Sequence, residues 1–186
     1  MLRMGVIGVG SMGQNHARIY SEMDCLEGVY DAFAESAQRI SKKLDTTAYS
    51  DVTSLLENVD ALSICTPTTT HYDTARQAIE MGRSVLVEKP FTGDVDKARV
   101  LCEMAESKGV ALASGFVERF NPVVEATKNS LASGRFGSVV SIASRRVSSF
   151  PSRIRDVGVV MDLAIHDIDV IRHLSAKNIE SVYALG

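Results

Sequence analysis

A glycine-rich run near the amino end is the first segment whose residue types and spacing suit a chemical task. It reads Gly8, Val9, Gly10, Ser11, Met12, Gly13 and fits G-x-G-x-x-G between an apolar run and an amphipathic stretch. In such a turn the first glycine permits a tight bend, the second lets a pyrophosphate approach the backbone, and the third lets strand and helix pack closely. Because the helix end adds N–H groups and a dipole that favour anions, these six residues predict a dinucleotide site.

An acidic residue at the end of the next apolar run strengthens this prediction. Asp31 lies 18 residues beyond Gly13, where a carboxylate meets the adenosine ribose hydroxyls. Its charge repels a 2′-phosphate, and Ala32 and Phe33 add no positive charge, so we expect NAD rather than NADP. The alternative is that Asp31 caps the helix that runs through Glu35.

Two polar, proline-containing segments follow later apolar runs. They contain Thr66, Pro67 and His71 in the first and Glu88, Lys89 and Pro90 in the second. Ligands of open α/β sheets lie beyond the carboxyl ends of the strands, so both segments are candidates for a site. Glu88 and Lys89 are equally compatible with a solvated strand end, and His71 alone is more typical of a helix start than of a catalyst.

A third candidate is a polar stripe near the carboxyl end. Asp162, His166, Asp169 and His173 follow the spacing i, i+4, i+7, i+11 on a helix that is otherwise mostly apolar. A carboxylate four residues before an imidazole can fix its tautomer and raise its basicity, as a general base requires. The alternative is an amphipathic helix that turns this face to water. We expect no metal, because H-E-x-x-H is absent and no cysteine is near.

The scaffold for the first two candidates is an alternation of short apolar runs and helix-length stretches. Apolar runs at 2–7, 28–33, 61–65, 84–87 and 110–114, with a weak strand near residue 48, predict parallel strands that are buried on both faces. We therefore expect an α/β, Rossmann-type doubly wound domain over residues 1–117.

The pattern changes from residue 118 onward. Helices at 122–132 and 162–174 alternate with strands at 138–147 and 179–185. Two strands give little sheet for a core, so residues 118–186 predict the beginning of an α+β substrate domain that is incomplete in this sequence.

Composition narrows the class of protein. The 186 residues carry 20 Lys and Arg against 23 Asp and Glu, without a block of like charge, which argues against nucleic acid or an anionic membrane as the main partner. The apolar runs are too short for a bilayer span or a signal peptide, so we expect a cytoplasmic protein. Cys25, Cys65 and Cys102 are scattered and predict neither a disulfide framework nor a zinc site.

Taken in order, these segments resemble the Gfo/Idh/MocA oxidoreductase family. The motifs are the glycine turn with Asn15-His16-Ala17, Asp31, Thr66-Pro67 with His71, Glu88-Lys89-Pro90, and Asp162 with His166-Asp167. The resemblance covers the whole chain and implies an NAD-dependent sugar dehydrogenase. It implies that Lys89 hydrogen-bonds the substrate oxygen, that His166 takes the hydroxyl proton and that Asp162 supports them. It also implies that Thr66, Pro67, His71 and Glu88 line the cofactor.

Within the family, residues 117–122 and 144–158 are similar to members that oxidise position 3 of the UDP-sugar UDP-N-acetylglucosamine. Guanidinium groups suit a diphosphate, so we expect substrate contacts from Arg145, Arg146, Arg153 and Arg155. Two residues of the first segment, Arg119 and Asn121, are further expected substrate contacts. The alternatives are a solvated arginine loop and, for Arg119 and Asn121, bracing of the domain hinge.

Two other functions stay open from the sequence. One is a noncatalytic dinucleotide-binding or sensing module, which the incomplete second domain favours. The other is a dehydrogenase of a free polyol or monosaccharide, in which the arginines do not touch substrate. Family members continue well beyond residue 186 and usually associate through the second domain, so we expect a homo-oligomer and regard turnover by this chain alone as an open question.

Overall fold

The computed structural model describes residues 1–147 and 158–185. The chain divides into two compact units, Met1–Gly115 and Phe116–Gly186. Among the helices of the described ranges, none is long and apolar enough to cross a membrane.

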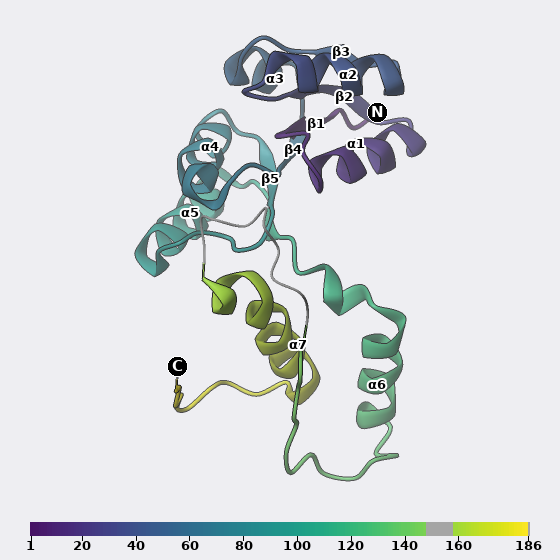
Figure 1. Cartoon of the computed structure of the whole chain (residues 1–186). Helices are drawn as coiled ribbons and strands as arrows, with labels where there is room; N and C mark the ends of the chain where they lie inside the picture. The colour runs from purple at the N-terminus through teal and green to yellow at the C-terminus, as the bar shows by residue number, and fades with distance from the viewer. Residues whose placement is uncertain (148–157, 186) are drawn as a thin grey trace. The chain divides into compact units, whose positions relative to one another are not determined.

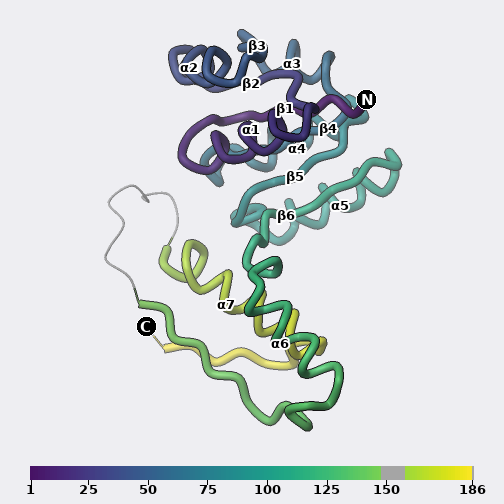
Figure 2. The backbone as a smooth tube through the Cα atoms, turned by 90° about the vertical axis from the view of Figure 1, so that its right-hand side faces the viewer, coloured from purple at the N-terminus to yellow at the C-terminus, as the bar shows by residue number. Residues whose placement is uncertain are grey.

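The first unit is built on a six-stranded parallel sheet. Its strands are β1 (Met4–Ile7), β2 (Leu26–Tyr30), β3 (Thr47–Ala48), β4 (Ala61–Ile64), β5 (Ser84–Val87) and β6 (Leu112–Ser114). Figure 2 shows them stacked in the order β3-β2-β1-β4-β5-β6. The winding direction therefore reverses between β1 and β4, which confirms the predicted Rossmann-type fold and places its ligand crevice at those two strands.

Five helices connect the strands (Figure 1). They are α1 (Gly13–Glu22), α2 (Ala34–Leu44), α3 (Val52–Asn58), α4 (Thr68–Glu80) and α5 (Val95–Lys108). Side chains of Asp51 and Asp94 accept hydrogen bonds from first-turn N–H groups of α3 and α5. Such caps fix where these two helices begin. The first turn of α1 has no side-chain cap, which leaves the glycine turn as its only lead-in.

Two apolar clusters cover the two faces of the sheet. One cluster packs Ile7 of β1 with Leu56 of α3 and with buried residues of α4 and α5. The other packs Val6 of β1 with Ala17 of α1 and Ile40 of α2. The adjacent residues Val6 and Ile7 thus serve opposite faces, as the two-residue period of a strand requires. Because both faces are covered by helices, the central strands are mostly apolar, and most polar side chains near the sheet lie at the strand ends.

The second unit contains helical elements in its described residues. They are the 3-10 turn η1 (Val117–Phe120), α6 (Pro122–Ala132), the π-helical turn η2 (Val160–Ala164) and α7 (Ile165–Ser175). The predicted strands at 138–147 and 179–185 are wrong, because neither segment forms a strand in the described structure. A strand exists only through a hydrogen-bonded neighbour, and these segments lie exposed along their whole length.

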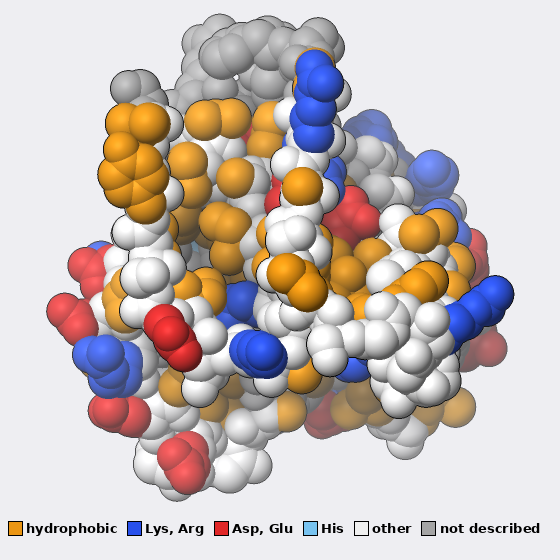
Figure 3. All heavy atoms as spheres, turned by 90° about the horizontal axis from the view of Figure 1, so that it is seen from below, with side chains coloured by type: hydrophobic (Ala, Val, Ile, Leu, Met, Phe, Trp, Pro, Cys, Tyr) orange, Lys and Arg blue, Asp and Glu red, His pale blue; other side chains and the backbone are white. Residues whose placement is uncertain are grey.

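Hydrophobic side chains are therefore left on the surface of the second unit. Val140, Val182, Tyr183 and Leu185 are each at least 81% exposed. Figure 3 shows hydrophobic side chains at the surface in one view of the molecule. A patch of this kind on a folded unit is typical of a surface that another chain segment or subunit covers.

Candidate functional site

The carboxyl ends of the central strands lie in register. Ile7 pairs with Tyr30 on one side and with Ile64 on the other, and Ile64 pairs with Val87. The next residues continue the ladder: the N–H groups of Gly8, Cys65, Glu88 and Gly115 donate to Tyr30, Ile7, Ile64 and Val87 at 2.8, 2.8, 2.9 and 2.8 Å. The residues that follow each strand thus meet at one edge of the sheet. This edge brings together the glycine turn, Asp31, the Thr66 segment and Glu88-Lys89, as predicted for an open α/β sheet.

The three glycines of the turn have different surroundings. Gly8 has a positive φ of 82°, and a Cβ there would lie 2.9 Å from the backbone of Cys65. A Cβ on Gly13 would overlap the carbonyl oxygen of Gly8. A Cβ on Gly10 would meet nothing within 4 Å, and Gly10 is exposed. The first and third glycines therefore allow the turn to form, whereas the second keeps a free approach to the backbone that fits the pyrophosphate of a dinucleotide.

Asp31 is bound to the glycine turn. Its Oδ2 accepts the N–H of Val9 at 2.8 Å, and its Oδ1 accepts the N–H of Phe33 at 2.9 Å. Helix α2 begins after Phe33 without a side-chain cap hydrogen bond, so Asp31 bonds before the helix and does not cap its first turn. A carboxylate has about four lone-pair sites. Half of them are free for ribose hydroxyls, and Asp31 is only partly buried.

The segment after β4 is stabilised by a buried histidine. His71 is 1% exposed; its Nε2 lies 2.8 Å from the carbonyl oxygen of Thr66 and its Nδ1 lies 2.9 Å from that of Pro90. The imidazole thus ties the turn after β4 to the turn after β5. Thr66 is half-buried and Pro67 is exposed, so these two remain available to a ligand while His71 supports them from below.

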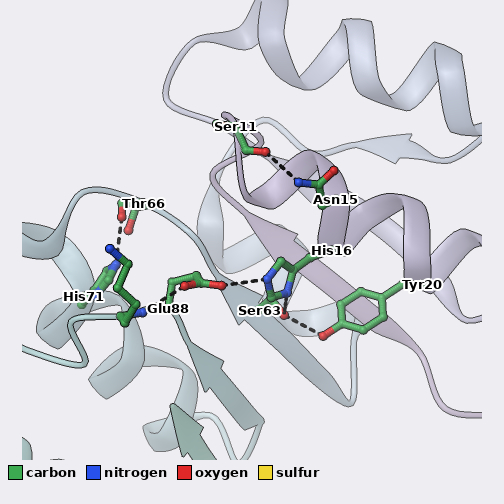
Figure 4. Close-up of polar contacts among 9 residues, drawn as sticks. Ser11, Asn15, His16, Tyr20, Ser63, Thr66, His71 and Glu88 are labelled. Atoms are coloured by element: carbon green, nitrogen blue, oxygen red, sulfur yellow. Dashed lines mark hydrogen bonds and ion pairs between the residues drawn. The ribbon is translucent and has the colours of Figure 1, made fainter. Parts of the chain in front are cut away.

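Glu88 is buried in a polar network at the same edge (Figure 4). The Nε2 of His16 lies 2.9 Å from Glu88 Oε1, and the Nδ1 of His16 lies 3.0 Å from the hydroxyl of Ser63. The hydroxyl of Tyr20 lies 2.6 Å from the same Ser63 oxygen. The other Glu88 oxygen, Oε2, accepts the N–H of Lys89 at 3.0 Å. Glu88 is therefore not a solvated strand end, because it is buried and each of its oxygens has a partner inside the fold.

The network sets the charge state of Glu88. Burial raises the pKa of Glu88, but the hydrogen bonds from His16 and from the Lys89 N–H outweigh burial and hold the pKa below its ordinary value. For Tyr20, burial raises the pKa and the Ser63 hydrogen bond only partly offsets this. The cluster therefore holds a carboxylate beside a neutral phenol at neutral pH.

His16 was expected only as part of the family motif, with no role of its own, and Ser63 and Tyr20 were not predicted to be site residues. His16 and Tyr20 are four residues apart and share one face of α1, while Ser63 is a fully buried polar residue in β4. A serine inside an apolar strand is the one sequence signal that points to a buried polar partner.

Lys89 follows Glu88 at this edge. Its side chain is half-buried, and the Lys89–Pro90 peptide bond is cis. The two neighbours of Lys89 are anchored separately, Glu88 by His16 and Pro90 by His71. The turn that carries the predicted catalytic ammonium group is therefore fixed from two helices, α1 and α4.

The two aspartates of the polar stripe, Asp162 and Asp169, have different surroundings. Asp169 is buried and accepts from Arg119 at both oxygens, with Nε to Oδ2 at 2.7 Å and Nη2 to Oδ1 at 2.5 Å. Asp162 is also buried and lies in the π-helical turn, one turn before the half-buried His166. Single π turns occur frequently at functional sites. A water-facing stripe is therefore excluded for both aspartates, and Asp162 with His166 remains the pair that can do proton chemistry.

The predicted substrate contacts of the second unit mostly have partners of their own. Arg146 donates to Asp167 at 3.0 Å through Nε and lies 3.7 Å from Glu118. Asn121 accepts the N–H of Val123 at 3.1 Å and thereby caps α6. Arg119 is held by Asp169, as described above. Arg145 is exposed, and Arg153 and Arg155 lie outside the described residues.

Comparison with known proteins places the chain in a family. Residues 2–116 match the model described as "Oxidoreductase family, NAD-binding Rossmann fold", and residues 124–186 match the Gfo/Idh/MocA C-terminal domain. The chain is 38% identical over 185 residues to UDP-N-acetylglucosamine 3-dehydrogenase of Acidithiobacillus ferrooxidans, covering 100% of the chain and 58% of that relative. It is 33% identical over 190 residues to inositol 2-dehydrogenase of Rhizobium meliloti, covering 98% of the chain and again 58% of the relative.

A solved structure agrees with these matches. The crystallised UDP-N-acetylglucosamine 3-dehydrogenase GnnA of Acidithiobacillus ferrooxidans superposes with a TM-score of 0.86 at 39% identity, over 94% of this chain and 57% of that one. The chain thus spans little more than half the length of the relatives that it matches. With its glycine turn, its Asp31 and its strand order, it belongs to the Gfo/Idh/MocA oxidoreductase family, and its first unit is the family's NAD-binding Rossmann domain.

Proposed function

We propose that this protein is an NAD-dependent dehydrogenase that oxidises a secondary hydroxyl of a sugar. The observation that carries this proposal is the anchored turn of Lys89 at the sheet edge that also carries the glycine turn and Asp31. A binding or sensing module needs the glycine turn and Asp31 but has no use for a lysine on a turn that two histidines anchor at the same edge. The noncatalytic alternative is therefore the weaker one.

Each predicted catalytic residue has a part in this chemistry. Bound NAD supplies the hydride acceptor for the carbinol carbon. Lys89 donates a hydrogen bond to the substrate oxygen and stabilises the negative charge that develops on it. His166 accepts the hydroxyl proton, and the buried Asp162 supports the imidazole in the basic form.

We further propose that the substrate is a nucleotide sugar such as UDP-N-acetylglucosamine, oxidised at position 3. The support is the identity to the Acidithiobacillus ferrooxidans relative over the whole chain and the exposed Arg145. A pocket of about 300 Å³ in the second unit, lined by Arg172 and Lys177 among others, adds to this support. Guanidinium and ammonium groups in such number suit a phosphate-bearing ligand.

The test is a comparison of substrates in the presence of NAD. We expect the protein to form reduced NAD with UDP-N-acetylglucosamine and not with myo-inositol. Arg145→Gln raises KM for the UDP-sugar about tenfold, the loss of one charge-assisted hydrogen bond. The matched control is Arg135→Gln, an exposed arginine of the same unit, which leaves KM unchanged. An unchanged KM in Arg145→Gln contradicts the role of Arg145.

A polyol dehydrogenase is the second candidate, and a specific observation favours it. Arg146 and Arg119, two of the predicted diphosphate contacts, are already paired with Asp167 and Asp169. Inositol dehydrogenases are also among the relatives, at 33% identity in one case. Turnover of myo-inositol with no turnover of the UDP-sugar would establish this candidate in place of the first.

A further inference from the structure

The polar cluster around Glu88 is expensive for the fold and needs an explanation. Glu88 is 6% exposed and Ser63 is fully buried, and burial of an ionised carboxylate costs several kcal/mol unless it is paired and hydrogen-bonded. Four side chains from three elements meet here: His16 and Tyr20 from α1, Ser63 from β4 and Glu88 from the end of β5 (Figure 4). An apolar core at this position would make the fold more stable, so the cluster serves something other than stability.

For a neutral His16 and an ionised Glu88, one direction of the hydrogen bonds satisfies all four groups of the cluster. A neutral His16 donates from Nε2 to Glu88 and accepts at Nδ1 from the Ser63 hydroxyl. The Ser63 oxygen in turn accepts from the Tyr20 hydroxyl. Every donor then points toward the carboxylate. Tyr20 and Ser63 thereby select the His16 tautomer that carries its proton on the Glu88 side.

The Glu88 carboxylate connects this hydrogen-bond network to the backbone of Lys89. Glu88 Oε1 is held by His16, and Oε2 accepts the backbone N–H of Lys89 at 3.0 Å. On the other side Gly115 leaves no spare room, because a Cβ there would lie 3.0 Å from the carboxyl carbon of Glu88. The carboxylate therefore cannot rotate without losing a partner or meeting the backbone. Its position fixes the peptide plane from which the Lys89 side chain departs.

We propose that His16 is a positioning residue for Lys89, acting through Glu88, with Tyr20 and Ser63 setting its tautomer. The inference rests on the proposed function in one respect, since it takes Lys89 as the group that touches substrate. His16 itself touches neither substrate nor cofactor in this account. It lies in the first turn of α1, just after the glycine turn, and holds the end of β5 through Glu88.

The test compares His16→Ala and His16→Gln with the unchanged protein. Loss of the His16 hydrogen bond frees Glu88, so we expect the Lys89 amide to exchange with solvent about 10- to 100-fold faster in His16→Ala. With a displacement of about 1 Å at the reacting group, kcat falls about 100-fold while the Kd for NAD stays unchanged. In His16→Gln the glutamine side chain can donate to Glu88, so we expect the Lys89 exchange rate and kcat both to return part of the way to the values of the unchanged protein. Arg18→Gln, in an exposed ion pair on the same helix, is the control and changes neither.

The outcomes separate this inference from the proposed function. Amide exchange at Lys89 is read without substrate, so it decides the role of His16 even if no sugar is turned over. An unchanged Lys89 exchange rate in folded His16→Ala overturns the inference, as does a loss confined to NAD affinity. If His16→Ala does not fold, Tyr20→Phe provides the measurement, because it removes only the hydroxyl that fixes the tautomer. It should speed Lys89 exchange in the same direction and by less, and no change in Tyr20→Phe overturns the inference.

Discussion

The glycine turn makes two substitutions of the same size act in opposite ways. Gly10→Ala and Gly13→Ala each add one methyl group, at positions three residues apart. At Gly10 the methyl group meets nothing within 4 Å, and the φ angle of Gly10 is outside the left-handed region. At Gly13 the methyl group overlaps the carbonyl oxygen of Gly8, which is backbone and cannot rotate away.

The magnitudes follow from these surroundings. Gly10→Ala restricts the unfolded chain at a compatible position, so the free energy of unfolding is unchanged or rises by about 0.4–1 kcal/mol. Its methyl group occupies the approach that the pyrophosphate needs, and loss of one charge-assisted hydrogen bond to the backbone weakens NAD binding at least about tenfold. Gly13→Ala forces α1 away from β1 and lowers the free energy of unfolding by about 1–3 kcal/mol.

The assay pairs urea unfolding with calorimetric titration of NAD. The prediction is a dissociation of the two quantities: Gly10→Ala loses affinity without losing stability, and Gly13→Ala loses stability. Gly93→Ala is the matched control, because a Cβ there also meets nothing within 4 Å and Gly93 lies outside the turn. NAD binding by Gly10→Ala as tight as that of the unchanged protein would refute the assignment of the open space at Gly10 to the pyrophosphate.

Three further predictions concern single side chains, and a fourth concerns the apolar surface of the second unit. Asp31→Ala should reduce the preference for NAD over NADP, because it removes the charge that repels a 2′-phosphate; a constant ratio of the two Kd values would leave Asp31 only its bonds to Val9 and Phe33. Burial raises the pKa of Glu88 but the His16 and Lys89 hydrogen bonds hold it lower, so its contribution to stability is present above pH 4.5 and lost as the pH falls through the lower folded pKa. Urea unfolding against pH should show Glu88→Gln converging on the unchanged protein at acid pH, and a gap that does not vary with pH would contradict this. Arg119→Met leaves the buried Asp169 unpaired and should cost about 3 kcal/mol, near the lower end for a buried pair because Arg119 is 41% exposed; Arg99→Met, in an exposed pair, should cost about 0–1 kcal/mol. The exposed apolar side chains of the second unit predict self-association, which size-exclusion chromatography would show as elution ahead of a 20.1 kDa monomer.

Periodicity was enough to predict the first unit from the sequence. Its strands are buried on both faces, so each reads as a short apolar run, and the glycine turn and Asp31 stand at the ends of the first two. The burial of Glu88 could not be predicted from the sequence. Its partner His16 is 72 residues away, and only the register of β1, β4 and β5 brings α1 above the end of β5.

The second unit was predicted less well, for a physical reason. Alternation of apolar and polar residues at 138–147 shows that a strand would suit the segment, but a strand also needs a hydrogen-bonded partner. The described residues of this unit offer none. For the polar stripe, the spacing predicts which side chains share a face but not that Arg119 pairs with the buried Asp169.

The central claim, that Lys89 acts on the substrate in an NAD-dependent oxidation, is tested most directly by one substitution. Lys89→Met keeps most of the length of the side chain and removes its charge. The measurement is the rate at which reduced NAD forms from UDP-N-acetylglucosamine, taken beside the Kd for NAD and with Lys108→Met, at the exposed end of α5, as control. We expect Lys89→Met to lose turnover by about 100-fold or more with NAD affinity retained. Turnover by Lys89→Met at the rate of the unchanged protein would contradict it.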